Sequence, residues 1–118
     1  MVERRVLGLA GEHLAERELE RLGHHVVARN VRTRMGEIDL VCREGDGYLF
    51  VEVKTRRAGS FVAAVEAIDR RKAERLAALA QSWLARRGER DRPWRILIAA
   101  LTVTTGGTTV ELLPLEIG

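Results

Sequence analysis

The sequence is poor in cysteine, proline and aromatic residues, and these shortages exclude several classes of site. Its single cysteine, Cys42, has no partner for an intrachain disulfide and excludes a zinc site built from cysteines. Aromatic side chains make up only 4% of the chain, so we do not expect a stacking surface for single-stranded nucleic acid. Cys42 is predicted to pack in the core as a small apolar residue.

Long apolar runs are also missing. No segment approaches the length of a membrane span, and residues 1–13 lack the apolar core of a secretory signal. We therefore expect a cytoplasmic protein with no membrane contact. The 118 residues, 46% of them apolar, are enough for a single domain, 1–118, with a genuine core.

Lysine is scarce, although the chain is basic. Among 20 Lys and Arg residues only Lys54 and Lys72 are lysines, and the formal net charge is +3. The planar guanidinium of arginine suits bidentate contact with phosphate, but codon bias would produce the same composition. The charge therefore allows a nucleic-acid partner without requiring one.

Apolar periodicity predicts two long helices. In residues 6–22, one stripe holds Leu14, Ala15, Leu19 and Leu22, and Gly23 is placed to end the helix. A second helical region starts at about residue 62 and breaks near Asp69, which would cap a segment over 70–87. In that segment the apolar stripe, which includes Trp83 as a core residue, is Leu76, Leu79, Ala80, Trp83 and Leu84.

The remaining segments read as strands and turns. Residues 24–29 predict a short strand, 30–35 a basic connection, 36–54 a hairpin and 55–60 a loop. Residues 95–103 form an apolar run suited to a buried strand, and 109–115 a final edge strand, since Pro114 cannot donate to a ladder. The fold class is therefore α/β, a mixed sheet flanked by helices in the order α-β-β-β-α-β-β.

The hairpin carries charges where a strand is usually apolar. Its turn lies in 44–47, and a two-residue or a four-residue loop gives the same register, with Arg43 opposite Tyr48. Continuing that register places Asp39 opposite Glu52 and Glu37 opposite Lys54, with all four side chains on one face.

Two carboxylates that face each other repel unless a cation lies between them. Mg²⁺ or Mn²⁺ held by Asp39 and Glu52 would polarise a phosphodiester and lower the pKa of a bound water. Lys54, on the same face as Glu52, would orient that water or stabilise developing charge. Glu12 on the first helix is a further candidate ligand, and Gly8 and Gly11 would let backbone or DNA approach closely. The alternative is a solvated strand face with ordinary ion pairs, such as Glu37 to Lys54.

Arginines flank this hairpin at both ends. They are candidates for DNA phosphate contact, the alternative being an arginine-rich surface: Arg29, Arg32, Arg34, Arg56 and Arg57. Arg70, Arg71 and Lys72 are weaker candidates for the same phosphate contact, the alternative being the start of a solvated helix. His24 and His25 point to opposite faces of a strand, so they are not expected to bind one metal ion.

Three strings, GEHLAERELERLG, ARNVRTRMGEIDLV and VEVKTRR, resemble the YraN family of small bacterial proteins over about residues 8–105. The resemblance implies a restriction-endonuclease-like fold, the PD-(D/E)xK nuclease superfamily, and similarity to archaeal Holliday-junction resolvases. It implies that Asp39 and Glu52 are metal-binding acids, that Lys54 is the catalytic lysine, and that Glu12 lies near the metal. Glu37 matches the family's Gly-Glu pair and is a second-tier candidate.

The chain departs from the family pattern in two places. Members usually read R-F-D-V near the fourth strand, where this chain has residues 95–98 with Leu97 in place of the aspartate. They tend to read T-P-R-K before the second helix, where this chain has residues 69–72. The lost aspartate affects positioning or helix packing and leaves Asp39, Glu52 and Lys54 in place.

We therefore expect a Mg²⁺- or Mn²⁺-dependent endonuclease acting on DNA, branched or damaged DNA included. The alternatives are a nucleic-acid-binding module with the same fold that does not cleave, and a protein-interaction subunit. By analogy with enzymes that cut both strands of a branched substrate, a homodimer is expected.

Overall fold

The computed structural model describes residues 2–58 and 69–115, and side-chain environments from residue 10 onward. Its elements are α1 (Val2–Arg21), β1 (His25–Thr33), β2 (Gly36–Glu44), β3 (Gly47–Arg57), α2 (Arg70–Arg86), β4 (Trp94–Thr104) and β5 (Gly107–Leu115). This is the predicted α-β-β-β-α-β-β order. The helical turn expected before Asp69 lies outside the described residues.

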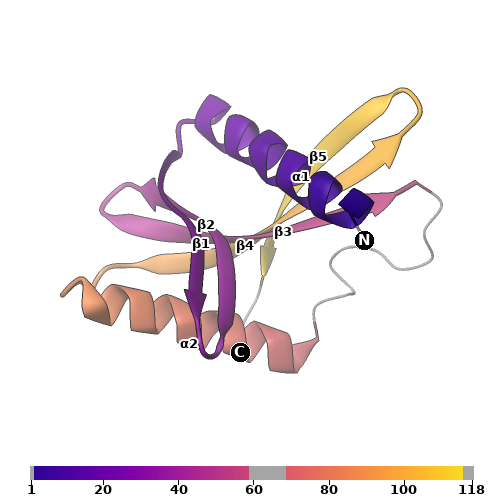
Figure 1. Ribbon diagram of the computed structural model, residues 1–118. Coiled ribbons are helices and arrows are strands. Elements are labelled where there is room, and N and C mark those ends of the chain that lie inside the picture. Colours follow the sequence, from indigo (N-terminus) through magenta and orange to yellow (C-terminus); the bar gives the residue numbers. More distant parts are fainter. Residues whose placement is uncertain (1, 59–68, 116–118) are drawn as a thin grey trace.

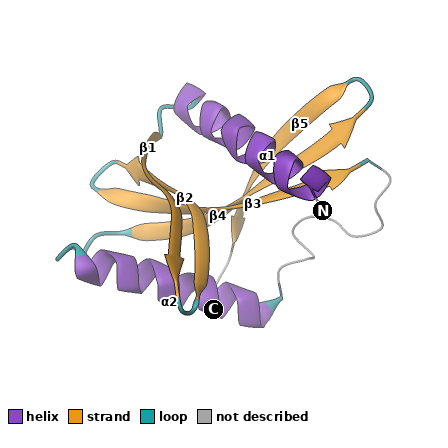
Figure 2. Cartoon of the chain, viewed as in Figure 1, coloured by secondary structure: helices purple, strands orange, loops and turns teal. Residues whose placement is uncertain are grey.

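The five strands form one mixed sheet in the order β1-β2-β3-β4-β5. Neighbouring strands are antiparallel except β3 and β4, which are parallel and are joined by the crossover that contains α2 (Figure 1). The predicted fold class is thereby confirmed, and β5 is an edge strand as its proline indicated. Figure 2 shows α1 over one face of the sheet and α2 over the other.

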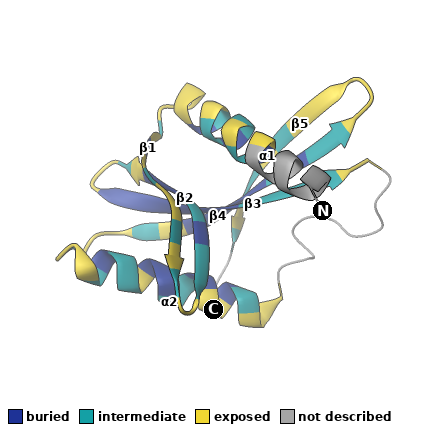
Figure 3. Ribbon diagram, viewed as in Figure 1, coloured by how far each residue is buried: buried dark blue, intermediate teal, exposed yellow. Residues whose placement is uncertain are grey.

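Two apolar clusters fill the spaces between the helices and the sheet. Leu49 and Val51 of β3 face α1, where they pack with Ala15 and Leu19. Tyr48 and Phe50 face α2, where the predicted stripe packs against them: Leu76, Leu79, Ala80 and Leu84, with Trp83 partly buried beside it. The ribbon coloured by burial shows buried stretches along β3 and α2 (Figure 3). Alternation along β3 therefore gives each helix its own core. Cys42 is fully buried in the first cluster, as predicted.

Each helix has the capping residue that the sequence predicted, Gly23 after α1 and Asp69 before α2. Gly23 has φ +90°, and the backbone N–H of His24 donates to the Leu19 carbonyl at 2.9 Å, which is a Schellman motif. Asp69 caps α2 by accepting a hydrogen bond from the Lys72 backbone N–H at 2.9 Å. The prediction for Leu22 is wrong: it is 49% exposed, because the helix has ended before it.

Two expected connections are strand instead. The segment 30–35 was expected to link two strands, but β1 continues through Thr33 and only Arg34 and Met35 form the turn. Likewise β3 continues to Arg57 and not into a loop after Lys54. Backbone pairing with β2 and β4 holds these residues extended, and polar side chains are accepted because one side of each segment faces solvent.

Candidate functional site

The site lies where β2 and β3 separate. Pairing runs from Glu44–Gly47 through the predicted Arg43–Tyr48 to Leu40–Val51, and there the described ladder ends. Just beyond, the Asp39 carboxylate accepts the backbone N–H of Val53 at 2.7 Å. The side chain of Asp39 therefore satisfies a backbone donor at the point where the ladder stops.

This divergence corrects part of the predicted register. Glu37 does not pair with Lys54; it lies across from Arg32 of β1, with an ion-pair distance of 3.5 Å. The physical reason is that the β1–β2 hairpin bends away to pack on α2. A Cβ at Gly36 would lie 3.3 Å from the Arg75 side chain. The ion pair between Glu37 and Lys54, considered as an alternative, does not form.

The predicted pairing of Asp39 with Glu52 is not part of the β2–β3 ladder, which ends one residue earlier, but other carboxylates still act on Asp39. Burial raises its pKa to about 7, and repulsion from Glu52 contributes next, with smaller contributions from Glu12 and Glu37. The hydrogen bond from Val53 opposes this rise. Four acids from three elements therefore share one electrostatic environment.

Glu52 is the buried member of the group, with 8% of its surface exposed. It belongs to β3, beyond Phe50 on the face that α2 covers. Two ammonium groups converge on one of its oxygens: Lys54 Nζ lies 3.6 Å and Lys72 Nζ 3.1 Å from Oε1. The carboxylate is thus held by one lysine from its own strand and one from a helix.

The two lysines differ in their protonation equilibria. Burial lowers the pKa of Lys54, and the neighbouring Lys72 lowers it further. Burial also acts to lower the pKa of Lys72, but contacts with Lys54 and Glu52 outweigh it and raise that pKa. Lys54 is therefore the lysine that gives up its proton more readily.

Lys72 is a site residue that the sequence interpretation missed. The sequence offers it only as a weak phosphate-contact candidate or as the start of a solvated helix, whereas its side chain reaches Glu52 from the first turn of α2. The available signal was Asp69, since an N-cap residue fixes which side chains of the first turn point toward the sheet.

Glu12 enters the site from α1. A Cβ at Gly11 would come within 2.5 Å of Thr55 Oγ1, so glycine lets the helix lie this close to β3 without displacing the Thr55 side chain. Burial raises the pKa of Glu12, followed by repulsion from Glu37. Oriented with its amide nitrogen toward the acids, Asn30 donates to Glu12 Oε1 at 2.8 Å and to Glu37 Oε1 at 2.9 Å. Asn30, with φ +48°, is a second residue that the sequence interpretation did not assign to the site.

We call these six side chains the acid–lysine cluster: Glu12, Glu37, Asp39, Glu52, Lys54 and Lys72. With Arg32 on Glu37, four carboxylates face three cations. The charges balance when Asp39 keeps its proton. Loss of that proton leaves an excess negative charge, which is the condition under which a cation binds well.

The predicted phosphate-contacting arginines are not gathered in one place. Arg29 makes a two-pronged ion pair with Glu16 of α1 at 2.7 and 2.6 Å. Arg32 borders the acid–lysine cluster through Glu37, and Arg34 is exposed in the β1–β2 turn. Arg56 and Arg57 lie at the far end of β3.

The donor set can be compared with the needs of a divalent cation. Among the side chains described, those of residues 10–58 and 69–115, no three His, Cys, Asp or Glu side chains are grouped closely enough to form a metal cage. Asp39 and Glu52 instead offer two carboxylates beside an open strand end. Two carboxylates completed by water and substrate phosphate are a usual Mg²⁺ arrangement, so these residues fit such an ion.

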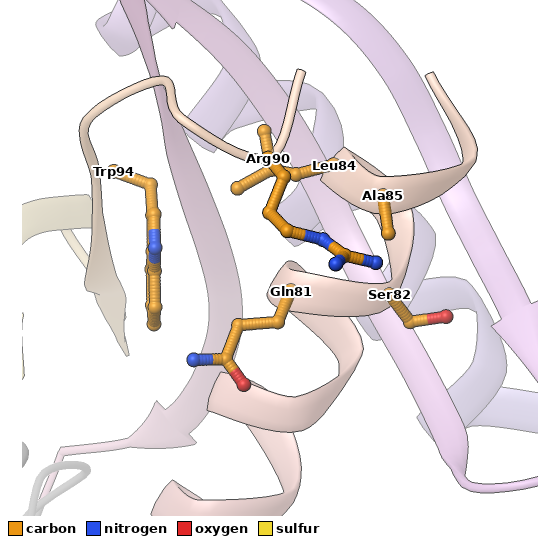
Figure 4. Close-up of a pocket in the computed structure, with 6 residues that line it drawn as sticks. All are labelled: Gln81, Ser82, Leu84, Ala85, Arg90 and Trp94. Atoms are coloured by element: carbon orange, nitrogen blue, oxygen red, sulfur yellow. The ribbon is translucent and has the colours of Figure 1, made fainter. Parts of the chain in front are cut away.

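A surface pocket of about 440 Å³ lies at the other end of α2. Figure 4 shows Trp94 on one side of it, with Arg90 and Gln81 opposite. Lys72 belongs to the first turn of α2, whereas Gln81 and the other helical lining residues belong to its last turns. The pocket is therefore separate from the acid–lysine cluster.

Two further sequence features can be placed. Leu97, which stands where the family pattern has an aspartate, is buried in the α1-side core at 4% exposure. It packs as an apolar residue and replaces whatever polar contact an aspartate would make there. In the described part of the chain, no helix has the length and apolar character needed to cross a membrane.

Fold and site together define a small α/β protein whose mixed sheet lies between two helices and opens at an acid–lysine cluster. A sequence model described as "Uncharacterised protein family UPF0102" matches residues 11–101, and the chain belongs to this family. The resemblance to the YraN family is thereby confirmed.

Its relatives include UPF0102 proteins from several bacteria. The chain is 47% identical over 112 residues to one from Chloroflexus aurantiacus, covering 92% of this chain and 88% of the relative. It is 49% identical over 88 residues to one from Streptomyces griseus (75% and 74% covered) and 39% identical over 110 residues to one from Anaeromyxobacter (93% and 83%).

Among solved structures, Pyrococcus furiosus SfsA in complex with Ca²⁺ aligns with a TM-score of 0.44 at 18% identity. The alignment covers 97% of this chain and 65% of SfsA, so the chain spans slightly less than two thirds of that protein's length.

Proposed function

We propose that this protein is a divalent-cation-dependent endonuclease that hydrolyses phosphodiester bonds in DNA, including branched or damaged DNA. The observation that carries the proposal is the convergence of Asp39, Glu52 and two lysines at the open end of the β2–β3 pairing. Membership of the UPF0102 family and the α-β-β-β-α-β-β order are consistent with it.

Each residue has a distinct part in the proposed reaction. Asp39 and Glu52 would hold Mg²⁺ or Mn²⁺, and Glu12 would assist directly or through water. When bound, the cation polarises the phosphoryl oxygen and acidifies a water molecule. Lys54, whose pKa is lowered by burial, would in its neutral form accept a proton from the attacking water as that water bonds to phosphorus. The P–O bond to the leaving sugar oxygen breaks, and that oxygen takes a proton from solvent water.

The experiment is a cleavage assay with Mn²⁺ on duplex, nicked and four-way DNA. We expect Glu52→Gln and Lys54→Ala each to lower the rate by at least about a hundredfold, because each removes a group used at the reacting phosphate. Glu74→Gln is the matched control, since Glu74 is an exposed α2 glutamate that pairs only with Arg70 among described partners. Circular dichroism confirms the fold of each variant, and persistent cleavage by both variants would rule out the mechanism.

A second candidate is a nucleic-acid-binding module that does not cleave. It is favoured by the two lysines already on Glu52 and by Leu97 in place of the family's aspartate. The same assay separates the candidates, because DNA binding with no Mn²⁺-dependent product selects the second. Absence of DNA binding at low salt would select a protein-interaction role for the chain.

We further propose a homodimer on branched DNA, since a two-fold axis would bring one acid–lysine cluster to each of two strands. Sedimentation of the protein alone and with a four-way junction tests this. A stoichiometry of one chain per junction at saturating protein would contradict it.

A further inference from the structure

Lys72 is held in place by the cap of its helix. Its backbone N–H donates to Asp69 Oδ1 at 2.9 Å, which fixes the conformation of the first turn of α2. From there the side chain, 32% exposed, extends to Glu52. The ammonium therefore lies at the border between the buried carboxylate and solvent.

The contact with Glu52 has a geometric consequence. Lys54 and Lys72 approach the same oxygen, Oε1, and Lys72 is the closer of the two at 3.1 Å. A divalent cation on Glu52 would repel both ammonium groups. Lys54 is anchored two residues away on the same strand, whereas Lys72 comes from another element and has a long stem free to turn toward solvent.

We propose that Lys72 is an exchangeable counter-ion and a DNA-phosphate ligand: it neutralises Glu52 without metal, and moves to a phosphate oxygen when a divalent cation takes its place. This inference rests on the proposed function and adds a residue to the site. Under this proposal Lys72 contacts phosphate only when a cation is bound, so the two events depend on each other.

The test compares Lys72→Gln with Arg71→Gln in the full chain. Both variants remove one positive charge from the same helical turn and keep a good helix former, but Arg71 is exposed and does not contact Glu52 in any described ion pair. We expect both variants to fold, because the Asp69 cap uses the backbone N–H of residue 72 and not its side chain. Thermal unfolding checks this.

The first readout is titration with Mn²⁺ and with Ca²⁺ in the absence of DNA. Removal of a competing ammonium should tighten ion binding by Lys72→Gln about threefold, the range of a partly exposed ion pair, and leave Arg71→Gln unchanged. Weaker or unchanged ion binding by Lys72→Gln would overturn the proposal.

The second readout is affinity for a DNA duplex at several salt concentrations, in EDTA and in Ca²⁺. In EDTA, Lys72→Gln should bind like the parent, because Lys72 is occupied by Glu52. In Ca²⁺ it should lose affinity, and the slope of log K against log salt should fall by about one contact. An equal loss in EDTA and Ca²⁺, or the same loss in Arg71→Gln, would overturn it.

The two levels of proposal fail in different ways. If the parent protein binds neither Mn²⁺ nor Ca²⁺, the proposed function and this inference fail together. If the parent binds cation and DNA but Lys72→Gln matches Arg71→Gln in both readouts, only the exchange by Lys72 is wrong.

Discussion

Two opposing influences act on the protonation of the Asp39 carboxyl group. Its carboxylate accepts the Val53 N–H, which favours the charged form, while burial and the neighbouring acids favour the protonated form. Because the second influence is larger, the pKa rises to about 7. The group therefore titrates near neutral pH in the absence of a cation.

This shift predicts how stability depends on pH. A carboxyl group with a raised pKa in the folded state binds its proton more tightly there than in the unfolded chain, where the pKa is about 3.9. The free energy of unfolding should therefore decrease from about pH 4 to about pH 7. In EDTA at pH 8, Asp39→Asn should be more stable than the parent by about 2 kcal/mol, a value that allows for the partial exposure of the carboxyl group. At pH 4 the two proteins should be nearly equal in stability.

Urea unfolding of both proteins at the two pH values measures this difference. Glu74→Gln, which changes an exposed carboxylate, is the control and should show no such dependence. If Asp39→Asn lowers the free energy of unfolding by the same amount at both pH values, the pKa of Asp39 is not raised in the folded protein.

At the scale of elements, the first turn of α2 joins stability to the site. Asp69→Ala removes the cap and should lower the free energy of unfolding by about 1 kcal/mol. It should also loosen the Lys72–Glu52 contact, because the backbone N–H of Lys72 loses the carboxylate that accepts its hydrogen bond. Denaturant unfolding measures the first effect, and backbone amide exchange in α2 the second.

Arg70→Ala is the matched control for that change. Arg70 pairs with Glu74 at 3.3 Å in an exposed i,i+4 arrangement, with 90% and 63% of the side chains exposed. Its loss should cost no more than about 0.5 kcal/mol. Equal effects of the two variants would mean that the cap does not stabilise α2.

The start of β3 depends on close approach to the segment before β4. A Cβ at Gly47 would lie 2.0 Å from the carbonyl oxygen of Pro93, and the Tyr48 N–H donates to that same oxygen at 3.0 Å. Gly47→Ala should therefore destabilise the protein by about 2–3 kcal/mol, since backbone must move. Gly106→Ala, where the nearest atom is 3.8 Å away, should change stability by less than about 0.5 kcal/mol. Thermal unfolding measures both variants.

Most elements were predictable because their signals are local. The α2 stripe, the Asp69 cap and the Gly23 terminus follow from residues within one or two turns. The full length of β1 and β3 could not be predicted from local signals. Polar residues 30–33 and 55–57 become strand only because they pair with β2 and β4. Lys72 was missed for the same reason, since its partner is 20 residues away on another element.

At the scale of the whole molecule, the arginines are distributed around the sheet. Arg34 lies in the exposed β1–β2 turn, and Arg90 lies beside the pocket at the C-terminal end of α2. If DNA enters along the acid–lysine cluster, Arg34→Gln should reduce the slope of log K against log salt by about one, and Arg90→Gln should leave it unchanged. Fluorescence anisotropy with a labelled duplex measures both; equal slopes for the two variants would place the DNA elsewhere.

The amino-acid sequence by itself determined the alternation of the hairpin, the capping residues Gly23 and Asp69, and the choice of the carboxylates and Lys54, because these depend on spacing along the chain. Only the tertiary structure decided that β2 leaves β3 at Asp39, that Glu37 turns to Arg32, and that Lys72 reaches Glu52. The reason is physical: strand twist and helix packing set distances between segments that are remote in sequence, and no local pattern encodes those distances.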